Sequence, residues 1–160
     1  MRIFVPKETH PAERRIPMLP GGAAKLVKLG AEIEVEQGLG TALNYTDRDY
    51  ESAGAKISTD RLGSLAEADM LLRLRKPPLN EVDILRKGCI HASFLNPFNE
   101  RELVLRFAAA EVTAVSMEMI PRTTVAQNMD VLSSQANLAG YVAVTLAKCS
   151  MATRKSQSPV

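Results

Sequence analysis

The sequence predicts an α/β fold in which helices cover both faces of a parallel sheet. Short apolar runs that are typical of strands alternate along the chain with segments that have one apolar side at helical spacing. Short turns rich in glycine, proline and asparagine separate them. A strand, a helix and a second strand connected in this way usually place the two strands parallel.

The predicted strands are bounded by residues that stop a β-ladder. Pro6, for example, ends the run MRIFVP because proline has no backbone donor. We expect strands at 1–6, 31–37, 55–58, 69–75, 89–95 and 112–118. We expect helices between them at 23–29, 47–54, 80–87 and 100–109, and one that ends at 66. Expected N-cap residues are Thr46, Thr59 or Asp60, and Asn99.

A long final helix is predicted at 128–148. Asn128 is a good N-cap, and Asp130 suits the first turn, where the helix dipole favours negative charge. Apolar residues occupy nearly all sides of this helix, so we expect a second body of protein to cover it. We therefore divide the chain into a first domain at 1–127, a long interdomain-type helix at 128–149 and a disordered tail at 150–160.

Length and composition are those of a soluble globular protein. The chain has 160 residues, of which 46% are hydrophobic and 24% charged. A net charge of +2 is too small to indicate a nucleic-acid partner. Cys89 and Cys149 lack spaced Cys or His neighbours, which argues against a metal site. No signal peptide or membrane-spanning run is visible, so we expect a cytoplasmic protein.

Functional loops of a parallel sheet lie at the carboxyl ends of its strands. Polar or charged residues stand beside a proline at four such ends, 6–8, 75–77, 96–97 and 121–122. Each alone is most simply explained as a strand stop with a solvated charge. Together, at the same edge of one sheet, they indicate a cleft. Arg15 and Lys76 are further candidate anion-binding residues.

Gly38-Leu39-Gly40 follows an expected strand, as in a dinucleotide-binding loop. The third glycine of that fingerprint would stand at the position of Leu43, and no helix pattern opens there. We therefore favour a plain turn at this point.

The densest polar cluster lies at 117–141, MEMIPRTTVAQNMDVLSSQANLAGY. Arg122 offers a planar fork of donors, Gln127 an amide and Asp130 a carboxylate, and Ser133 follows in the helix. These groups suit recognition of a phosphate, a carboxamide or ribose hydroxyls. Without a cysteine, histidine or metal-ligand group, nucleophilic or metal chemistry is not expected here. A capped helix start with a solvated arginine explains the same residues, and both interpretations stay open.

Several stretches resemble one known family. PRTTVAQNMDVLSSQANLAGY is similar to the signature of the alpha subunit of proton-translocating NAD(P) transhydrogenase. MRIFVPKETHPAERRIPMLP resembles the N-terminal signature that this subunit shares with alanine dehydrogenase, and AEIEVEQGLG and LLRLRKP also fit. The resemblance covers about residues 1–148.

The resemblance implies a Rossmann-like first domain without the Gly-rich fingerprint, which a second, NAD-binding domain carries. It implies that Arg122, Gln127 and Asp130 act catalytically by positioning the nicotinamide of NAD(H), which they bind together with Ser133. Hydride then passes directly to NADP+ on a separate component. The implied partners are the second domain, the NADP-binding and membrane components, and a second copy in a homodimer. These partners would hold the chain on the cytoplasmic side, peripheral to the inner membrane.

Two departures from the family pattern matter. Residues that match Arg15 and Lys76 hold the keto-acid substrate in alanine dehydrogenases, but a catalytic histidine would stand there in place of Asn96. This argues against an alanine dehydrogenase remnant. No G-x-G-x-x-G occurs and the sequence stops soon after Lys148, so we expect a fragment that is inactive alone. A non-catalytic module that assembles through the helix at 128–148 is the alternative of a different class.

Overall fold

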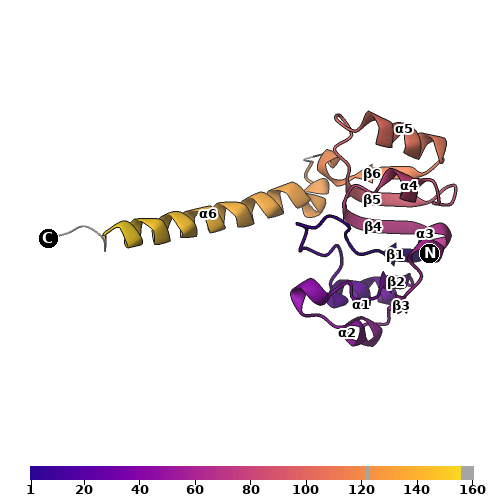
Figure 1. Ribbon diagram of the computed structural model, residues 1–160, viewed down its shortest axis with the longest axis horizontal. Helices are drawn as coiled ribbons and strands as arrows, with labels where there is room; N and C mark the ends of the chain where they lie inside the picture. The colour runs from indigo at the N-terminus through magenta and orange to yellow at the C-terminus, as the bar shows by residue number, and fades with distance from the viewer. Residues whose placement is uncertain (122, 156–160) are drawn as a thin grey trace. The chain divides into compact units, whose positions relative to one another are not determined.

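A computed structural model describes residues 1–121 and 123–155, apart from the side chains of 128 and 149–155. The chain divides into two compact units, Met1–Met117 and Glu118–Val160, which are described separately below (Figure 1).

The first unit is built on a six-stranded parallel sheet in the order β3-β2-β1-β4-β5-β6. Its strands are β1 (Arg2–Val5), β2 (Glu32–Glu36), β3 (Lys56–Ser58), β4 (Met70–Arg75), β5 (Ile90–Phe94) and β6 (Thr113–Ser116). Its helices are α1 (Pro20–Lys28), η1 (Thr41–Leu43), α2 (Asp47–Ser52), α3 (Arg61–Glu67), α4 (Leu79–Val82) and α5 (Arg101–Ala109), and η2 (Met117–Met119) follows β6. The predicted α/β class and parallel sheet are confirmed.

The strand order reverses between β1 and β4. The chain runs outwards from β1 through β2 to β3, and then returns to add β4, β5 and β6 on the other side. At such a reversal the two following loops leave in opposite directions, so a crevice opens at the carboxyl ends of the two central strands. The loops after β1 and β4 are therefore the natural place to look for a site.

Helices cover both faces of the sheet, and successive residues of β1 show why. Ile3 and Val5 belong to a core that α1 and α2 cover with Ala23 and Tyr50. Phe4 points the other way, because side chains alternate along a strand. It belongs to a second core with Leu65 of α3, Leu71 of β4, Val82 of α4, and Leu103 and Phe107 of α5.

Local signals explain the helix starts. Thr46 and Asp49 form the predicted capping box at α2, with the Thr46 N–H donating to the Asp49 carboxylate at 2.6 Å. Asp60 caps α3 by accepting from the Gly63 N–H at 3.0 Å. The cap predicted at Asn99 is wrong. Its amide instead donates to Asn96 Oδ1 at 2.9 Å, and the helix begins one residue after Glu100.

The helix predicted at 80–87 is shorter than expected. It ends at Val82, and the next turn tightens to an i→i+3 bond from Leu85 N to Val82 O at 3.2 Å. Leu85 is still buried by this tighter turn, which explains why its apolar spacing had indicated a longer helix.

The second unit contains a 3-10 turn, η3 (Ala126–Met129), and the long helix α6 (Val131–Lys155). The helix begins three residues later than predicted and continues beyond 149, into the segment for which we expected disorder. Asn128 is not its N-cap, because Asp130 accepts from the first free N–H groups of α6. The expectation for 156–160 lies outside the described residues, and the division at 127 and 128 stays a prediction.

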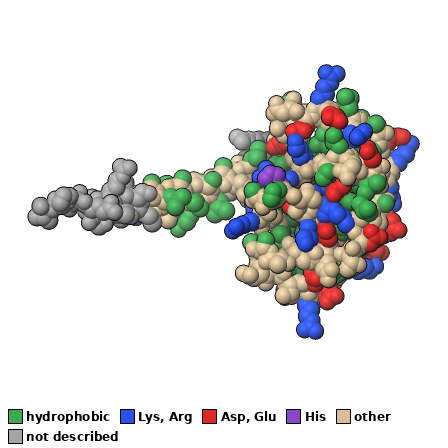
Figure 2. All heavy atoms as spheres, in the orientation of Figure 1, with side chains coloured by type: hydrophobic (Ala, Val, Ile, Leu, Met, Phe, Trp, Pro, Cys, Tyr) green, Lys and Arg blue, Asp and Glu red, His purple; other side chains and the backbone are tan. Residues whose placement is uncertain are grey.

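Large apolar side chains of α6 are exposed, as Figure 2 shows along the described part of the helix. They include Leu132, Leu138, Tyr141, Val142, Val144 and Leu146. No helix in the described part of the chain is long and apolar enough to cross a membrane.

Candidate functional site

Glu8 connects the loop after β1 to the end of β4. One carboxylate oxygen accepts from the Leu74 N–H at 2.5 Å, and the other accepts from the Arg75 N–H at 3.3 Å. The pairing of β4 with β5 shifts register between Leu72 and Arg75, which frees these N–H groups from the ladder. The two loops at the crevice are thus joined by a carboxylate rather than by a backbone ladder.

Glu13 holds two arginines from different loops. Its oxygens accept from Arg15 Nε and Nη2, both at 2.7 Å, and from Arg75 Nε at 2.8 Å. The Glu13 side chain is only 4% exposed although both guanidinium groups are half-exposed. The hydrogen bond from Arg15 is the main reason that the pKa of Glu13 falls to about 2, and the same contact raises the pKa of Arg15.

A buried ionic network fixes the backbone at Lys7. The Lys7 N–H donates to Glu36 at 2.7 Å, and Arg61 donates to the Lys7 carbonyl at 3.1 Å. Arg61 also pairs with Glu36 and, at 3.0 Å, with Glu81. Glu81 in turn pairs at 2.5 Å with Arg73, whose side chain is 1% exposed. The position where β1 ends is therefore held on both sides of its peptide unit.

The two candidate anion-binding residues already have carboxylate partners. Arg15 is paired with Glu13, and Lys76 forms an ion pair with Glu100 at the start of α5. Asn96 lies at the carboxyl end of β5 in a left-handed backbone conformation with φ of 52°. The structure therefore places these three residues on the loops that follow β1, β4 and β5, as the sequence indicated.

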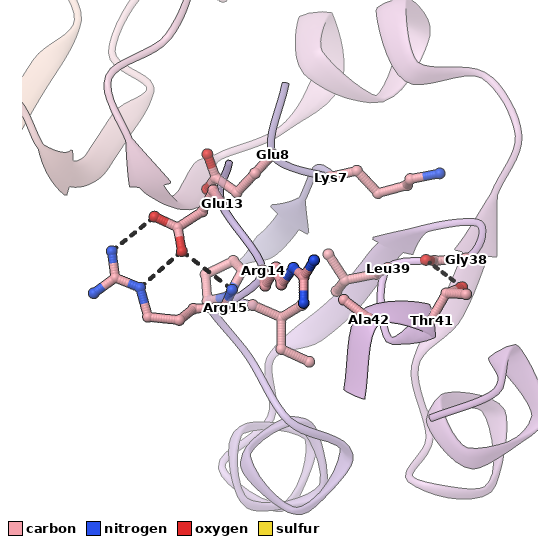
Figure 3. A pocket seen from close by; sticks show the side chains of 11 residues that line it. Lys7, Glu8, Glu13, Arg14, Arg15, Gly38, Leu39, Thr41 and Ala42 are labelled. Carbon is pink, nitrogen blue, oxygen red and sulfur yellow. Dashed lines mark hydrogen bonds and ion pairs between the residues drawn. The ribbon is translucent and has the colours of Figure 1, made fainter. Parts of the chain in front are cut away.

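A wide pocket of about 270 Å³ lies between the loop after β1 and the turn after β2 (Figure 3). Its lining includes Lys7, Glu8, Glu13, Arg14, Arg15 and Thr41. Charged side chains of both signs therefore meet beside one end of the crevice.

The turn at Gly38 agrees with the plain-turn interpretation. Gly38 has φ of 73°, and its N–H donates to Asp47 Oδ1 at 2.7 Å, so a carboxylate occupies the place that a phosphate would take in a dinucleotide-binding loop. At Gly40, a Cβ atom would lie 2.6 Å from the Cβ of Tyr45. Both glycines are thus required by the close turn.

His91 is a core residue. It is fully buried, its Nε2 lies 3.1 Å from Ser93 Oγ, and its ring centroid lies 5.1 Å from that of Phe107. Burial lowers the pKa of His91 to about 3, so the imidazole is neutral at physiological pH. It has no place at the carboxyl edge described above.

Three of the four site residues predicted from the sequence fall within the description of the second unit. Gln127 is exposed at η3. Asp130 accepts from the N–H groups of Leu132 and Ser133, both at 3.0 Å, and from the Ser133 hydroxyl at 2.5 Å. The structure therefore joins Asp130 and Ser133 in one helix cap, with Gln127 in the preceding turn. Arg122 lies outside the described residues.

Sequence reasoning missed Glu8 and Glu13, which organise the loop after β1. A signal was present, since each acid stands within two positions of a basic residue in PKETHPAERR. What could not be seen in the sequence is that both acids reach Arg75, which lies 67 positions from Glu8 and 62 from Glu13.

Comparison with known proteins gives one consistent result. The family model described as "Alanine dehydrogenase/PNT, N-terminal domain" matches residues 4–139. The first of the separate polypeptides that form the NAD(P) transhydrogenase alpha subunit of Rhodospirillum rubrum is 38% identical over 149 residues, which is 90% of this chain and 39% of that protein. Alanine dehydrogenase of Bacillus subtilis is 30% identical over 146 residues, 91% of this chain and 38% of that protein.

Solved structures agree with these relatives. The crystal structure of transhydrogenase from Sinorhizobium meliloti superposes with a TM-score of 0.85 at 39% identity, over 91% of this chain and 43% of that one. An L-alanine dehydrogenase structure gives a TM-score of 0.71 at 27% identity, over 75% of this chain and 33% of that one. The chain thus spans about two fifths of the length of the two transhydrogenase proteins named here.

Proposed function

Because this chain belongs to the family of N-terminal domains shared by alanine dehydrogenase and pyridine nucleotide transhydrogenase (PNT), we propose that it is the first domain of the NAD(H)-binding component of a proton-translocating NAD(P) transhydrogenase. The observation that carries the proposal is the match to transhydrogenases, at 38% and 39% identity against 30% and 27% for the alanine dehydrogenases. The TM-score of 0.85 over nearly the whole chain supports the same choice.

In this proposal, the nicotinamide end of NAD(H) contacts Arg122, Gln127, Asp130 and Ser133. The exposed Gln127 amide can both donate to and accept from a carboxamide. The Asp130 carboxylate is oriented by the N–H groups of α6, so its position is set before a ligand arrives. Such groups act by placing the reacting atoms, which is where a hydride transfer gains most from its enzyme.

NAD(H) would supply the chemistry by giving a hydride from its dihydronicotinamide to NADP+ on a partner component. The residues of this chain neither accept nor donate that hydride. Arg122, with its planar fork, would fix the carboxamide or a neighbouring phosphate, and the Gln127 amide and Asp130 carboxylate would set the ring's orientation. This division of work is consistent with a cluster that lacks a nucleophile.

A second, NAD-binding domain is the proposed partner of α6. The apolar side chains that α6 exposes, such as Leu138 and Val144 at 59% and 69%, would be covered by such a domain. The full assembly in this proposal also includes the NADP-binding and membrane components and a second copy in a homodimer. It places the chain on the cytoplasmic side, peripheral to the inner membrane.

Alanine oxidation is less well supported. Arg15 and Lys76, which resemble the keto-acid-binding residues of alanine dehydrogenase, each have a carboxylate partner already. Asn96 cannot act as an acid or base near neutral pH as a histidine can. A keto acid would have to displace Glu13 and Glu100, without the expected histidine beside it.

A complementation experiment tests the proposed function. The chain is mixed with the region of the Rhodospirillum rubrum protein that it does not match, and hydride transfer from NADH to an NADP+ analogue is measured with the partner components present. We expect transfer in the mixture and weak NADH binding by the chain alone. Micromolar NADH binding by the chain alone would contradict the need for a second domain. Alanine oxidation without transfer would favour alanine dehydrogenase, and a defined oligomer with neither activity would favour an assembly module.

The loop is tested in the same mixture. Arg122→Ala and Asp130→Asn should slow hydride transfer more than they weaken NADH binding, by about tenfold or more in rate, because misplacement costs more than weaker holding. Asp83→Asn, an exposed aspartate of the first unit, is the matched control and should leave both unchanged. Normal turnover in both loop variants would remove the loop from the mechanism.

A further inference from the structure

We propose that Lys7 and Arg14 form a binding site for the phosphate group of a small anionic ligand, in the pocket between the loop after β1 and the turn after β2. The site lies wholly within the first unit and shares no residue with the nicotinamide loop proposed above. It is therefore a separate site, whose existence does not depend on the transhydrogenase assignment.

The pocket has the size of a small-molecule site. Its volume of about 270 Å³ lies just below the roughly 300–1,000 Å³ of pockets for drug-sized ligands, which suits a phosphate with a short carbon skeleton. Ile16, Pro17, Leu39 and Ala42 supply its apolar walls. The cationic groups on its lining come from the loop after β1.

Two of these cations are not neutralised. Among the described residues, no carboxylate forms an ion pair with the Lys7 ammonium or the Arg14 guanidinium. Arg15 differs, because it pairs with Glu13 and points away from Arg14, which extends toward the Leu39 turn (Figure 3). A cation that faces a pocket without an acid partner attracts an anion from solution.

The acids on the lining cannot cancel this excess charge, because other groups already hold them. The Glu8 carboxylate accepts from the N–H groups of Leu74 and Arg75, and Glu13 is shared between Arg15 and Arg75. Counting these side chains with Lys7 and Arg14, four positive groups face two negative ones. The net charge of +2 therefore resides on Lys7 and Arg14.

The opposite wall of the pocket meets the Lys7 ammonium. Its Nζ lies 3.7 Å from where a Cβ of Gly38 would stand, so the lysine extends over the turn after β2. Thr41 donates its hydroxyl to the Gly38 carbonyl at 2.8 Å and thereby fixes this turn. The nearby Asp47 lines a different hollow, together with Asn44, Tyr45 and Thr46.

The loop that carries the two cations is already ordered. Glu36 and Arg61 hold both sides of the Lys7 peptide unit, and Glu13, next to Arg14, is held by Arg75. Binding therefore orders two side chains and no backbone, which lowers its entropic cost. Among small anions, phosphate fits best, because its dianion matches two positive charges and the arginine fork can contact two oxygens at once.

Titration of the full chain with inorganic phosphate, glycerol 3-phosphate and acetate, at constant ionic strength, tests the site. Backbone amide shifts at Gly38 and Thr41 report binding in the pocket, and Gly88 serves as a distant reference. We expect saturable shifts with both phosphates, tighter than with acetate. Lys7→Ala and Arg14→Ala should each weaken phosphate binding by about tenfold, as expected for losing a charged hydrogen bond.

Lys28→Ala and Arg101→Ala remove the same charges from exposed positions elsewhere and should change binding by less than about twofold. All four side chains are exposed, so the fold should tolerate each change. The proposal is overturned by the absence of saturable shifts at Gly38 and Thr41, or by equal weakening in control and pocket variants. Equal affinity for acetate would overturn the assignment to phosphate. No nicotinamide nucleotide enters the assay, so its result is independent of the proposed function.

Discussion

The loop after β1 and the loop before α6 both carry candidate functional residues, but they are held in different ways. In the first loop, Glu8 and Glu13 reach Arg75 across more than 60 positions of sequence. In the second loop, the hydrogen bonds of Asp130 with Leu132 and Ser133 span two or three positions. The first loop is thus positioned by the sheet, and the start of α6 by its own first turn.

This difference indicates where each loop obtains its functional geometry. A loop cross-linked to the sheet presents a preformed surface, here the pocket with Lys7 and Arg14. A locally capped helix can move as a unit while keeping its cap, so its place beside a cofactor is left to partners. Four predictions break or sharpen this contrast, beginning with the largest expected effect.

Glu81→Gln should destabilise the first unit by about 3–5 kcal/mol. The change leaves Arg73, whose side chain is 1% exposed, without its negative partner inside the protein. Urea unfolding measures the loss. Glu100→Gln, which removes the partner of the half-exposed Lys76, is the control and should cost less than about 1 kcal/mol. Equal small effects in both variants would show that the network does not anchor the loop.

Acid should weaken the sheet through His91. Its pKa falls from 6.5 to about 3 on folding, so below pH 6.5 the unfolded chain binds a proton that the folded chain does not. Stability from this group is complete above pH 6.5 and is lost as pH falls toward 3, with about 2 kcal/mol lost by pH 5. Unfolding free energies at pH 7 and pH 5 measure this slope. It should flatten in His91→Gln and persist in His10→Gln, which changes an exposed histidine.

Glu13→Gln should loosen the loop after β1 by about 1–2 kcal/mol, because two arginines lose a shared carboxylate. The pKa of Glu13 falls from 4.5 to about 2 on folding, so this contribution is complete above pH 4.5 and is lost as pH falls through 2. Amide exchange of Leu74 and Arg75 with solvent reports the loosening. Exchange as slow as in the unchanged chain would mean that Glu8 alone holds the two loops together.

Asp130→Ala should have the smallest effect, about 1 kcal/mol, confined to the first turn of α6. Amide exchange at Leu132 and Ser133 should accelerate about fivefold, while the unfolding of the first unit stays unchanged. Ser134→Ala is the matched control, since its hydroxyl makes only a 3.4 Å contact with the Asp130 carbonyl. A loss of sheet stability in Asp130→Ala would refute the contrast between the two loops.

Sequence patterns predicted the elements well where the cause is local. The strand ended by Pro6, the capping box at Thr46 and the turn at Gly38 all depend on residues within a few positions of one another. Errors arose where two local choices were nearly equal. Asn128 and Asp130 are both good caps, and the structure uses the acid, which accepts from two N–H groups and a hydroxyl.

Candidate site residues divide in the same way. Arg15 and Lys76 were found on the predicted loops because basic residues at strand ends are visible in the sequence. Their neutralisation by Glu13 and Glu100 was not visible, and neither was the free charge at Arg14. Which of two neighbouring arginines is paired depends on the direction of each side chain, which the folded backbone sets.

The alternation of strands and helices and the likeness of the 117–141 stretch to transhydrogenase are determined by the sequence itself, because both lie in the order of residues along the chain. The reversal between β1 and β4 brings Glu8 and Glu13 to Arg75, and only the tertiary structure decides this. The physical reason is that ionic contacts depend on distance in space. Strand order converts a separation of more than 60 positions into hydrogen-bonding range.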